Sequence, residues 1–218
     1  LIKKVRVPIM VDTTDAASIE RSLTYCQGKS IINSVNLEDG LEKFELVTPL
    51  ARTYGAALIV GCIDEDKQQA QAITRERKLE IAQRSWKLLT EDYGIRPGDI
   101  IFDPLVFPCA TGDRNYAGSA IETIEGIRLI KQALPGVLTS LGVSNLSFGL
   151  APHARPVLNS VMLYYCVQAG LDMAIVNPAH ITAYPDISPE EKELAEDLIF
   201  NRRADALREI AADVELNA

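Results

Sequence analysis

Carboxylate and carboxamide side chains recur where the apolar segments of this sequence end. They are Asp12, Asn33 with Asn36, Asp64, Asp103, Asn145 and Asn177, spread over six predicted strands. A carboxylate accepts hydrogen bonds and a carboxamide both accepts and donates, so a pocket lined by both suits a heteroaromatic ring with several N–H donors. A pterin has such edges, and adenine or a sugar also fits this pattern. Each Asp or Asn alone is more typical of a helix cap or turn, but recurrence at all six strand ends favours a pocket.

The elements that must position these side chains alternate between strands and helices. Apolar runs predict strands at 5–11, 30–35, 56–63, 100–102, 173–176 and from 138 onward. Apolar residues at helical spacing predict helices near 13–26, 40–54, 75–93, 119–134, 156–169, 189–200 and 205–214. This order is typical of parallel β-α-β units with right-handed crossovers. A doubly wound sheet and a (β/α)8 barrel both fit, although the glycine-rich phosphate motifs of the former do not occur.

Composition narrows the class of protein further. The chain has 218 residues and a net charge of −8, which argues against nonspecific nucleic-acid binding. The cysteines, Cys26, Cys62, Cys109 and Cys166, have none of the close spacings of a zinc or redox motif, and reduced thiols are typical of a cytoplasmic protein. No apolar run approaches the ~20 residues of a membrane helix. We therefore expect a cytoplasmic protein that binds neither nucleic acid, membrane nor metal.

Several short segments together carry a resemblance to a known family. They are PIMVDTT (8–14), SIINSVN (30–36), TRERK (74–78), IFDPL (101–105) and GVSNLSF (142–148), followed by VLNSV (157–161), IVN (175–177) and NRR (201–203). The set resembles the pterin-binding methyltransferase family, and within it the folate-binding domains of cobalamin-dependent methionine synthases. The resemblance covers nearly the whole chain, and it depends on the set of segments rather than on any single one.

The resemblance implies a fold, a reaction and a set of site residues. It implies an α/β fold, a (β/α)8 TIM barrel, with residues 1–218 as one pterin/folate-binding domain that lacks a counterpart to the family's first two strands. It implies methyl transfer from N5 of 5-methyltetrahydrofolate to cob(I)alamin, held by a cobalamin-binding domain of the same longer polypeptide, with no metal in this domain. By position, the pterin-holding residues are Asp12, Asn33 and Asp103, the catalytic residue beside N5 is Asn145, and weaker pterin positions are Asn36, Asp64 and Asn177.

Two alternatives remain open at this point. One is a stand-alone pterin enzyme, either a methyltransferase that serves a corrinoid iron–sulfur protein or a dihydropteroate synthase. The synthase must bind a pyrophosphate, and no Lys or Arg stands at a predicted strand end to do so. The other alternative is a non-catalytic folate-binding scaffold that presents its ligand to a partner. Methyl transfer would distinguish the methyltransferases from the scaffold.

Overall fold

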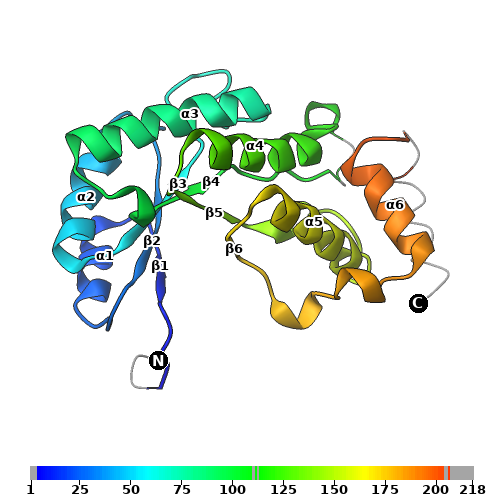
Figure 1. Ribbon diagram of the computed structural model, residues 1–218, viewed down its shortest axis with the longest axis horizontal. Helices are drawn as coiled ribbons and strands as arrows, with labels where there is room; N and C mark the ends of the chain where they lie inside the picture. The colour runs from blue at the N-terminus through cyan, green and yellow to red at the C-terminus, as the bar shows by residue number, and fades with distance from the viewer. Residues whose placement is uncertain (1–3, 110, 112, 204–205, 207–218) are drawn as a thin grey trace.

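Six parallel strands form one curled sheet in the computed structural model, which describes residues 4–109, 111, 113–203 and 206 (Figure 1). They are β1 (Met10–Asp12), β2 (Ile31–Val35), β3 (Ala57–Gly61), β4 (Ile100–Asp103), β5 (Leu138–Leu141) and β6 (Met173–Ala174). Each strand pairs in parallel with the next one along the chain. The chain therefore advances in one direction, one β-α unit at a time, as in a barrel. The predicted α/β fold, a partial (β/α)8 barrel, is confirmed.

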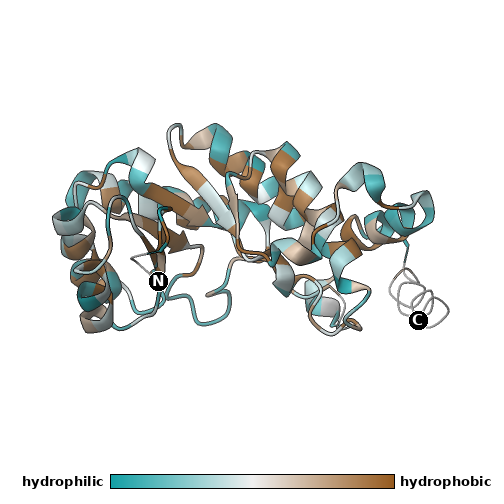
Figure 2. Cartoon of the chain, turned by 90° about the horizontal axis from the view of Figure 1, so that it is seen from below, coloured by the Kyte–Doolittle hydropathy of each residue, from teal (hydrophilic) through white to brown (hydrophobic). Residues whose placement is uncertain are grey.

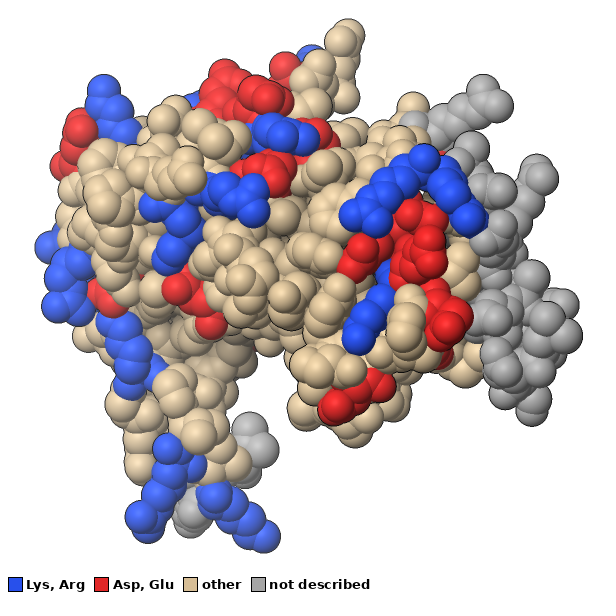
Figure 3. Space-filling model, turned by 45° about the vertical axis from the view of Figure 1, so that its right-hand side comes forward, with Lys and Arg blue, Asp and Glu red and all other residues tan. Residues whose placement is uncertain are grey.

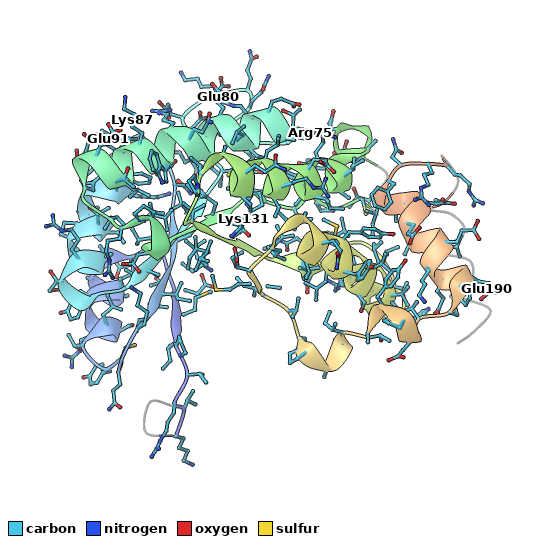
Figure 4. The ribbon with its side chains drawn as sticks, in the orientation of Figure 1. Arg75, Glu80, Lys87, Glu91, Lys131 and Glu190 are labelled. Carbon is cyan, nitrogen blue, oxygen red and sulfur yellow. The ribbon has the colours of Figure 1, made fainter. Side chains whose placement is uncertain are left out.

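Helices separate the strands and cover the convex face of the sheet (Figure 1). They are α1 (Ala16–Leu23), α2 (Glu42–Tyr54), α3 (Arg75–Lys87), α4 (Ser119–Ala133) and α5 (Arg155–Ala169), whereas α6 (Pro189–Ile199) follows β6 and packs against α5. The α3 and α4 helices lie side by side and are tied by Arg75, which is labelled in Figure 4. Its Nε and Nη2 donate to the two carboxylate oxygens of Glu122 at 3.0 and 2.5 Å. This bidentate pair fixes the two helices that lie behind the β4 strand.

The helix ends follow from local side-chain chemistry. Asp15 accepts a hydrogen bond from the Ser18 N–H at 2.8 Å and begins α1, and Thr74 does the same for α3. At the other end of a helix, a residue with positive φ lets the chain leave the helical path. Gly55 ends α2 at φ 65° and Gly170 ends α5 at φ 108°. These signals are visible in the sequence, and the predicted helices begin and end close to them.

The two faces of the sheet are packed to different depths. Outward side chains of β1–β4 form a large core with α1–α3, and β5 forms a second core with α4–α6. The inner face carries only a thin apolar cluster with Ala57, Ile59 and Ile101 at its centre. In Figure 2 the strands are mostly brown, and the helices carry both brown and teal residues. Most of the buried apolar side chains therefore lie between the sheet and the helices. The inner face of the sheet carries few of them.

Several described elements are shorter or less regular than predicted. The 5–11 strand is regular only at Met10–Asp12, and the predicted 75–93 helix is α3 followed by a π-helical turn at Leu88–Asp92. The predicted 205–214 helix lies outside the described residues, apart from Ala206. Of the described helices, none combines the length and apolarity that crossing a membrane requires. Figure 3 shows acidic and basic side chains interspersed on the face it draws. Some of these charges form ion pairs, such as Arg202 with Glu196 at 3.2 Å.

Candidate functional site

Side chains on the inner face of the sheet form an apolar layer and, above it, a polar one. Alternation along a strand sends every second side chain to the same face. The apolar layer consists of Met10, Ile31, Ile59, Ile101, Leu138 and Met173. Two residues further along the first five of these strands stand Asp12, Asn33, Gly61, Asp103 and Ser140, with Asp12 paired to Asn33 and Gly61 paired to Asp103 in register. The structure thus brings Asp12, Asn33 and Asp103 onto one face, near the carboxyl ends of the strands.

The Asp12–Asn33 pair occupies the β1–β2 end of this polar layer. Asn33 Nδ2 donates to Asp12 Oδ1 at 3.2 Å, so the inward-facing amide is paired with its neighbour in register. Asp12 is exposed and Asn33 is half-buried. No other side-chain hydrogen bond within the described part of the chain engages Asp12 Oδ2 or Asn33 Oδ1. These two acceptors are therefore available to the N–H groups of a ligand.

A pocket of about 310 Å³ lies at the carboxyl ends of β4 and β5. Its lining residues are Gln71, Asp103, Leu105, Val106, Phe107, Pro108, Tyr116, Gly142, Asn145 and Phe148. Two of its aromatic rings, Phe107 and Tyr116, stack with 5.0 Å between centroids and 10° between planes. The pocket combines a carboxylate, carboxamides and aromatic walls, which is a typical composition of a site for a flat, polar heterocycle.

Asp103 has few protein partners for a partly buried carboxylate. Its Oδ1 accepts a hydrogen bond from the Leu105 N–H at 2.8 Å, and none of the ion pairs in the described ranges includes it. Burial raises the pKa of Asp103 to about 6, although the Leu105 N–H and the positive charge of Lys78 act in the opposite direction. A carboxylate left in this condition can accept a ligand's N–H donors at neutral pH, because no arginine or lysine already occupies it.

Asn145 stands on the other side of the same pocket. It ends a single helical turn, Val143–Asn145, in which its backbone N–H donates to the Gly142 carbonyl at 3.2 Å. Its side chain is exposed, and within the described residues no hydrogen bond engages its amide. The Nδ2 atom lies over Gly142, 3.6 Å from the place a Cβ would occupy there. Asn145 therefore offers a free donor and a free acceptor at the pocket mouth.

The other predicted site residues already have local partners. Asn36 Oδ1 accepts from the Glu38 N–H at 3.0 Å, and Asn177 Oδ1 accepts from the Ala179 N–H at 3.1 Å, as turn and cap residues do. Asn177 lines a separate pocket beyond β5, together with Arg155. Asp64 is buried and bound to Arg77, whose Nη2 lies 2.5 Å from Asp64 Oδ2. The role of Asn36, Asp64 and Asn177 in pterin binding stays a prediction. In the structure the two amides accept hydrogen bonds from nearby backbone N–H groups, and Asp64 forms an ion pair.

The sequence patterns missed three kinds of residue around the pocket. Ser140 is buried, and its Oγ has no partner among the described residues. Like Asp103, it lies one position beyond the last pair of β4 with β5, a place that strand alternation could have indicated. Phe107 and Tyr116 belong to a loop whose sequence has no periodicity, so nothing local identifies them. Lys78 is buried below the pocket loop. Its spacing from the small buried residues Ala82 and Ser85 on α3 is the one signal that could have revealed it.

The thiols take no part in this site. The cysteines are unpaired, and burial raises the pKa of Cys62, Cys109 and Cys166 to about 12 in each case, so they stay protonated at neutral pH. Within the described ranges, no three His, Cys, Asp or Glu side chains are grouped as metal ligands would be. The polar groups of the site are therefore carboxylates, carboxamides and hydroxyls.

The fold and the site together define a class of protein: a partial (β/α)8 barrel with a polar pocket at the carboxyl ends of its strands. A family model described as pterin binding enzyme matches residues 1–177, and the chain belongs to this family. The chain is also 42% identical over 200 residues to the methionine synthases of Mycobacterium tuberculosis (strain ATCC 25618 / H37Rv) and Mycobacterium leprae (strain TN). Each alignment covers 90% of this chain and 16% of the relative, so the chain spans a small part of these proteins. The resemblance predicted from the sequence motifs is confirmed.

Proposed function

We propose that this chain is the folate-binding domain of a methionine synthase, and that it binds 5-methyltetrahydrofolate at the polar layer above the inner face of the sheet. The observation that carries the proposal is the pocket that contains both Asp103 and Asn145. The family match and the identity to two methionine synthases support a pterin as the ligand. The partner in the reaction is cob(I)alamin, carried by another domain of the same polypeptide, and it supplies the nucleophile that accepts the methyl group.

The polar layer supplies what a pterin ring requires. The ring has N–H donors along one edge, and the carboxylates of Asp12 and Asp103 accept such donors from the two ends of the layer. Asn33 lies between them and can accept from one ring atom. The apolar side chains of the inner face form a layer beneath these polar groups, and Gly61 adds no side chain to the space above that layer. Together these groups would hold the ring flat against the sheet.

Methyl transfer from N5 meets a difficulty that Asn145 is suited to resolve. An amine anion is a very poor leaving group, so N5 must be protonated or hydrogen-bonded as the methyl group departs. A carboxamide offers both a donor and an acceptor, and can therefore follow N5 from one protonation state to the other. The carboxylate of Asp103 favours the protonated ring electrostatically, since it lies in the same pocket and forms no ion pair within the described part of the chain.

Calorimetric titration of 5-methyltetrahydrofolate tests the proposal. It is applied to this chain and to a version extended upstream, because the relatives are longer. We expect binding that Asn33→Ala and Asp103→Ala abolish. In assays with added cob(I)alamin we expect Asn145→Ala to lower the transfer rate by about 100-fold while the ligand still binds. As a comparison, Asn177→Ala removes an amide whose Oδ1 already accepts from the Ala179 N–H, and we expect it to lower the transfer rate far less than Asn145→Ala does.

Three outcomes separate the proposal from its rivals. If no pterin binds to either version, the polar layer consists of helix caps and turns, and the proposed function is wrong. If a pterin binds tightly without any methyl transfer in the extended version, the domain is a scaffold. If Asn177→Ala lowers the transfer rate as much as Asn145→Ala does, the assignment of Asn145 to N5 is wrong.

A further inference from the structure

Lys78 is a fully buried lysine whose charge is held by backbone carbonyls. It lies in the first turn of α3 and is 0% exposed. Its Nζ donates to the carbonyls of Ala72 at 2.8 Å, Pro104 at 2.6 Å and Leu105 at 3.3 Å. No ion pair recorded for the described residues includes Lys78. A lysine is rarely buried without a carboxylate in contact, so the three carbonyls must offset the cost of burying this charge.

Two of the three carbonyls belong to the residues that directly follow Asp103. Leu105 has φ 64°, in the left-handed region that residues with a side chain rarely adopt. Its N–H donates to Asp103 Oδ1 at 2.8 Å, and its carbonyl accepts from both Lys78 Nζ and Thr123 Oγ1, the latter at 2.9 Å. The unusual backbone conformation therefore points the Leu105 N–H at the Asp103 carboxylate, and the two donors behind it hold that conformation.

The surroundings of Lys78 leave its side chain little freedom. On α4, a Cβ added to Gly126 would lie 2.6 Å from Lys78 Cδ, so the lysine stem passes directly over this glycine. On the pocket side, Nζ lies 5.2 Å from the centroid of the Phe107 ring, which lines the pocket. Lys78 thus connects the α3–α4 pair to the pocket wall and to the turn after β4.

We propose that Lys78 is a positioning residue: by binding the Pro104 and Leu105 carbonyls it fixes the turn after β4 and so sets the place of the Asp103 carboxylate in the pocket. The pterin as the ligand rests on the proposed function, whereas the positioning of Asp103 does not. The charge acts as well, because Cys62, Asp103 and Glu122 are the titratable groups that lie near Lys78. Burial lowers the pKa of Lys78 to about 8, and its positive charge lowers the pKa of Asp103.

The variant Lys78→Met tests this proposal, because methionine keeps the buried stem and removes the donor and the charge. We expect the affinity for 5-methyltetrahydrofolate at pH 7 to fall by about 10- to 100-fold, as displaced site groups do in general. The pH at which Asp103 takes up a proton should rise, since a nearby positive charge is lost. Both changes are measured with the chain folded, as judged by circular dichroism and thermal unfolding.

Lys131→Met is the matched control. Lys131 of α4, labelled in Figure 4, also binds a backbone carbonyl, that of Val137 at 3.0 Å, and also passes over a glycine, Gly170. It lies at the amino end of β5, where it pairs with Asp172 at 2.8 Å. Its loss should lower the unfolding temperature without a change in pterin affinity or in the titration of Asp103.

A readout without ligand separates this proposal from the proposed function. Carboxyl NMR of ligand-free chain gives the pKa of Asp103, and amide hydrogen exchange gives the protection of the Leu105 N–H. If the wild type binds no pterin but Lys78→Met raises that pKa and speeds that exchange at least tenfold, positioning stands and only the proposed function is wrong. If folded Lys78→Met leaves both values at those of the wild type, the positioning proposal is wrong.

A second variant covers the case in which Lys78→Met does not fold. The methyl group of Gly126→Ala must displace the Lys78 side chain, because the two would lie 2.6 Å apart. We expect the same loss of Leu105 protection and a several-fold loss of affinity. A folded Gly126→Ala chain with unchanged Leu105 exchange would overturn the proposal.

Discussion

Asp64 and Asp103 follow neighbouring parallel strands, yet their surroundings are opposite. Asp64, after β3, is buried and bound by Arg77, with Arg84 3.8 Å from the same Oδ2 oxygen. Asp103, at the end of β4, has one backbone N–H as its hydrogen-bond donor and lines a pocket. Asp103 pairs in register with Gly61, and Asp64 lies three residues beyond Gly61. An aspartate near the end of a strand thus holds a helix in one case and is left available to a ligand in the other.

The path of the chain after each strand explains the difference. After β3 the chain turns back on itself, with a bridge between Ile63 and Gln71, and the Asp64 N–H donates to the Ala70 carbonyl. This turn places Asp64 next to α3, where its carboxylate pairs with Arg77. After β4 the left-handed Leu105 turns the chain at once, and Asp103 stays on the inner face. A carboxylate is available for binding where the loop after its strand turns away from the helix layer.

Asp103→Asn should give the largest effect, on binding. The amide keeps the size of the side chain and an acceptor for the Leu105 N–H, but it loses the charge that faces the ligand. Hydrogen bonds to charged groups contribute more than neutral ones, so we expect about 100-fold weaker pterin binding, or ~2.7 kcal/mol, by calorimetry. The free energy of unfolding should stay equal or rise, because a buried charge is removed. Unchanged affinity would show that this carboxylate does not contact the ligand.

Asp64→Asn should show the opposite behaviour, a loss of stability without a loss of affinity. It leaves Arg77 partly buried with a neutral partner, although Glu80 still binds the guanidinium at 2.8 Å. We expect the free energy of unfolding to fall by about 2 kcal/mol, below the full cost of a broken buried pair. Chemical denaturation gives this value. If the pterin affinity also falls under conditions in which the variant is fully folded, Asp64 belongs to the binding site.

The fold could be predicted because its signals are local. Each strand is a short apolar run, and caps such as Asp15 and glycines such as Gly55 mark the helices. The alternation of the two elements then restricts the topology to parallel β-α-β units. The limits of β1 were predicted less well, since apolar residues such as Val5 and Val7 precede the paired segment without joining the ladder.

The site could be predicted only in part, because local sequence does not distinguish Asp64 from Asp103. Both follow an apolar run, and the difference depends on Arg77, which reaches Asp64 only through the fold. Lys78 was missed for a related reason. Hydrophobic patterns place a lysine on the surface, whereas here the tertiary contacts of the turn after β4 bury it. The partners of such residues come from other helices and strands, so they can be identified only from the structure.

The pH dependence of pterin binding should also distinguish Asp103 from Asp64, with an effect smaller than that of Asp103→Asn. Burial raises the pKa of Asp103 to about 6, so its ionised fraction falls to roughly a tenth at pH 5. We expect pterin affinity to weaken by about tenfold between pH 7.5 and pH 5. The contribution of Asp103 to the stability of the free chain has the opposite sign: it falls as pH rises from about 4 to 6, because the folded state binds the proton more tightly.

Two controls separate this effect from others. Asp103→Asn should remove the pH dependence of binding in this range, since its side chain does not titrate. Asp64→Asn should retain it. A wild-type affinity that is constant from pH 7.5 to pH 5 would show that the charge of Asp103 is not used.

Ser140→Ala should give the smallest effect and extends the comparison to the next strand. Ser140 is 1% exposed, and its Oγ has no partner among the described residues. Ser140 and Asp103 each lie one position beyond the Phe102–Thr139 pair of β4 and β5. If its hydroxyl binds the ligand, its removal costs about 1 kcal/mol, or roughly fivefold in affinity, without a loss of stability. Ser160→Ala is the matched control, because Ser160 is equally buried but already bonds to the Pro156 carbonyl and the Thr182 N–H. It should lower stability and leave the affinity unchanged. A selective loss of affinity in Ser140→Ala would assign this hydroxyl to the ligand, whereas equal results for the two serines would make Ser140 an ordinary core residue.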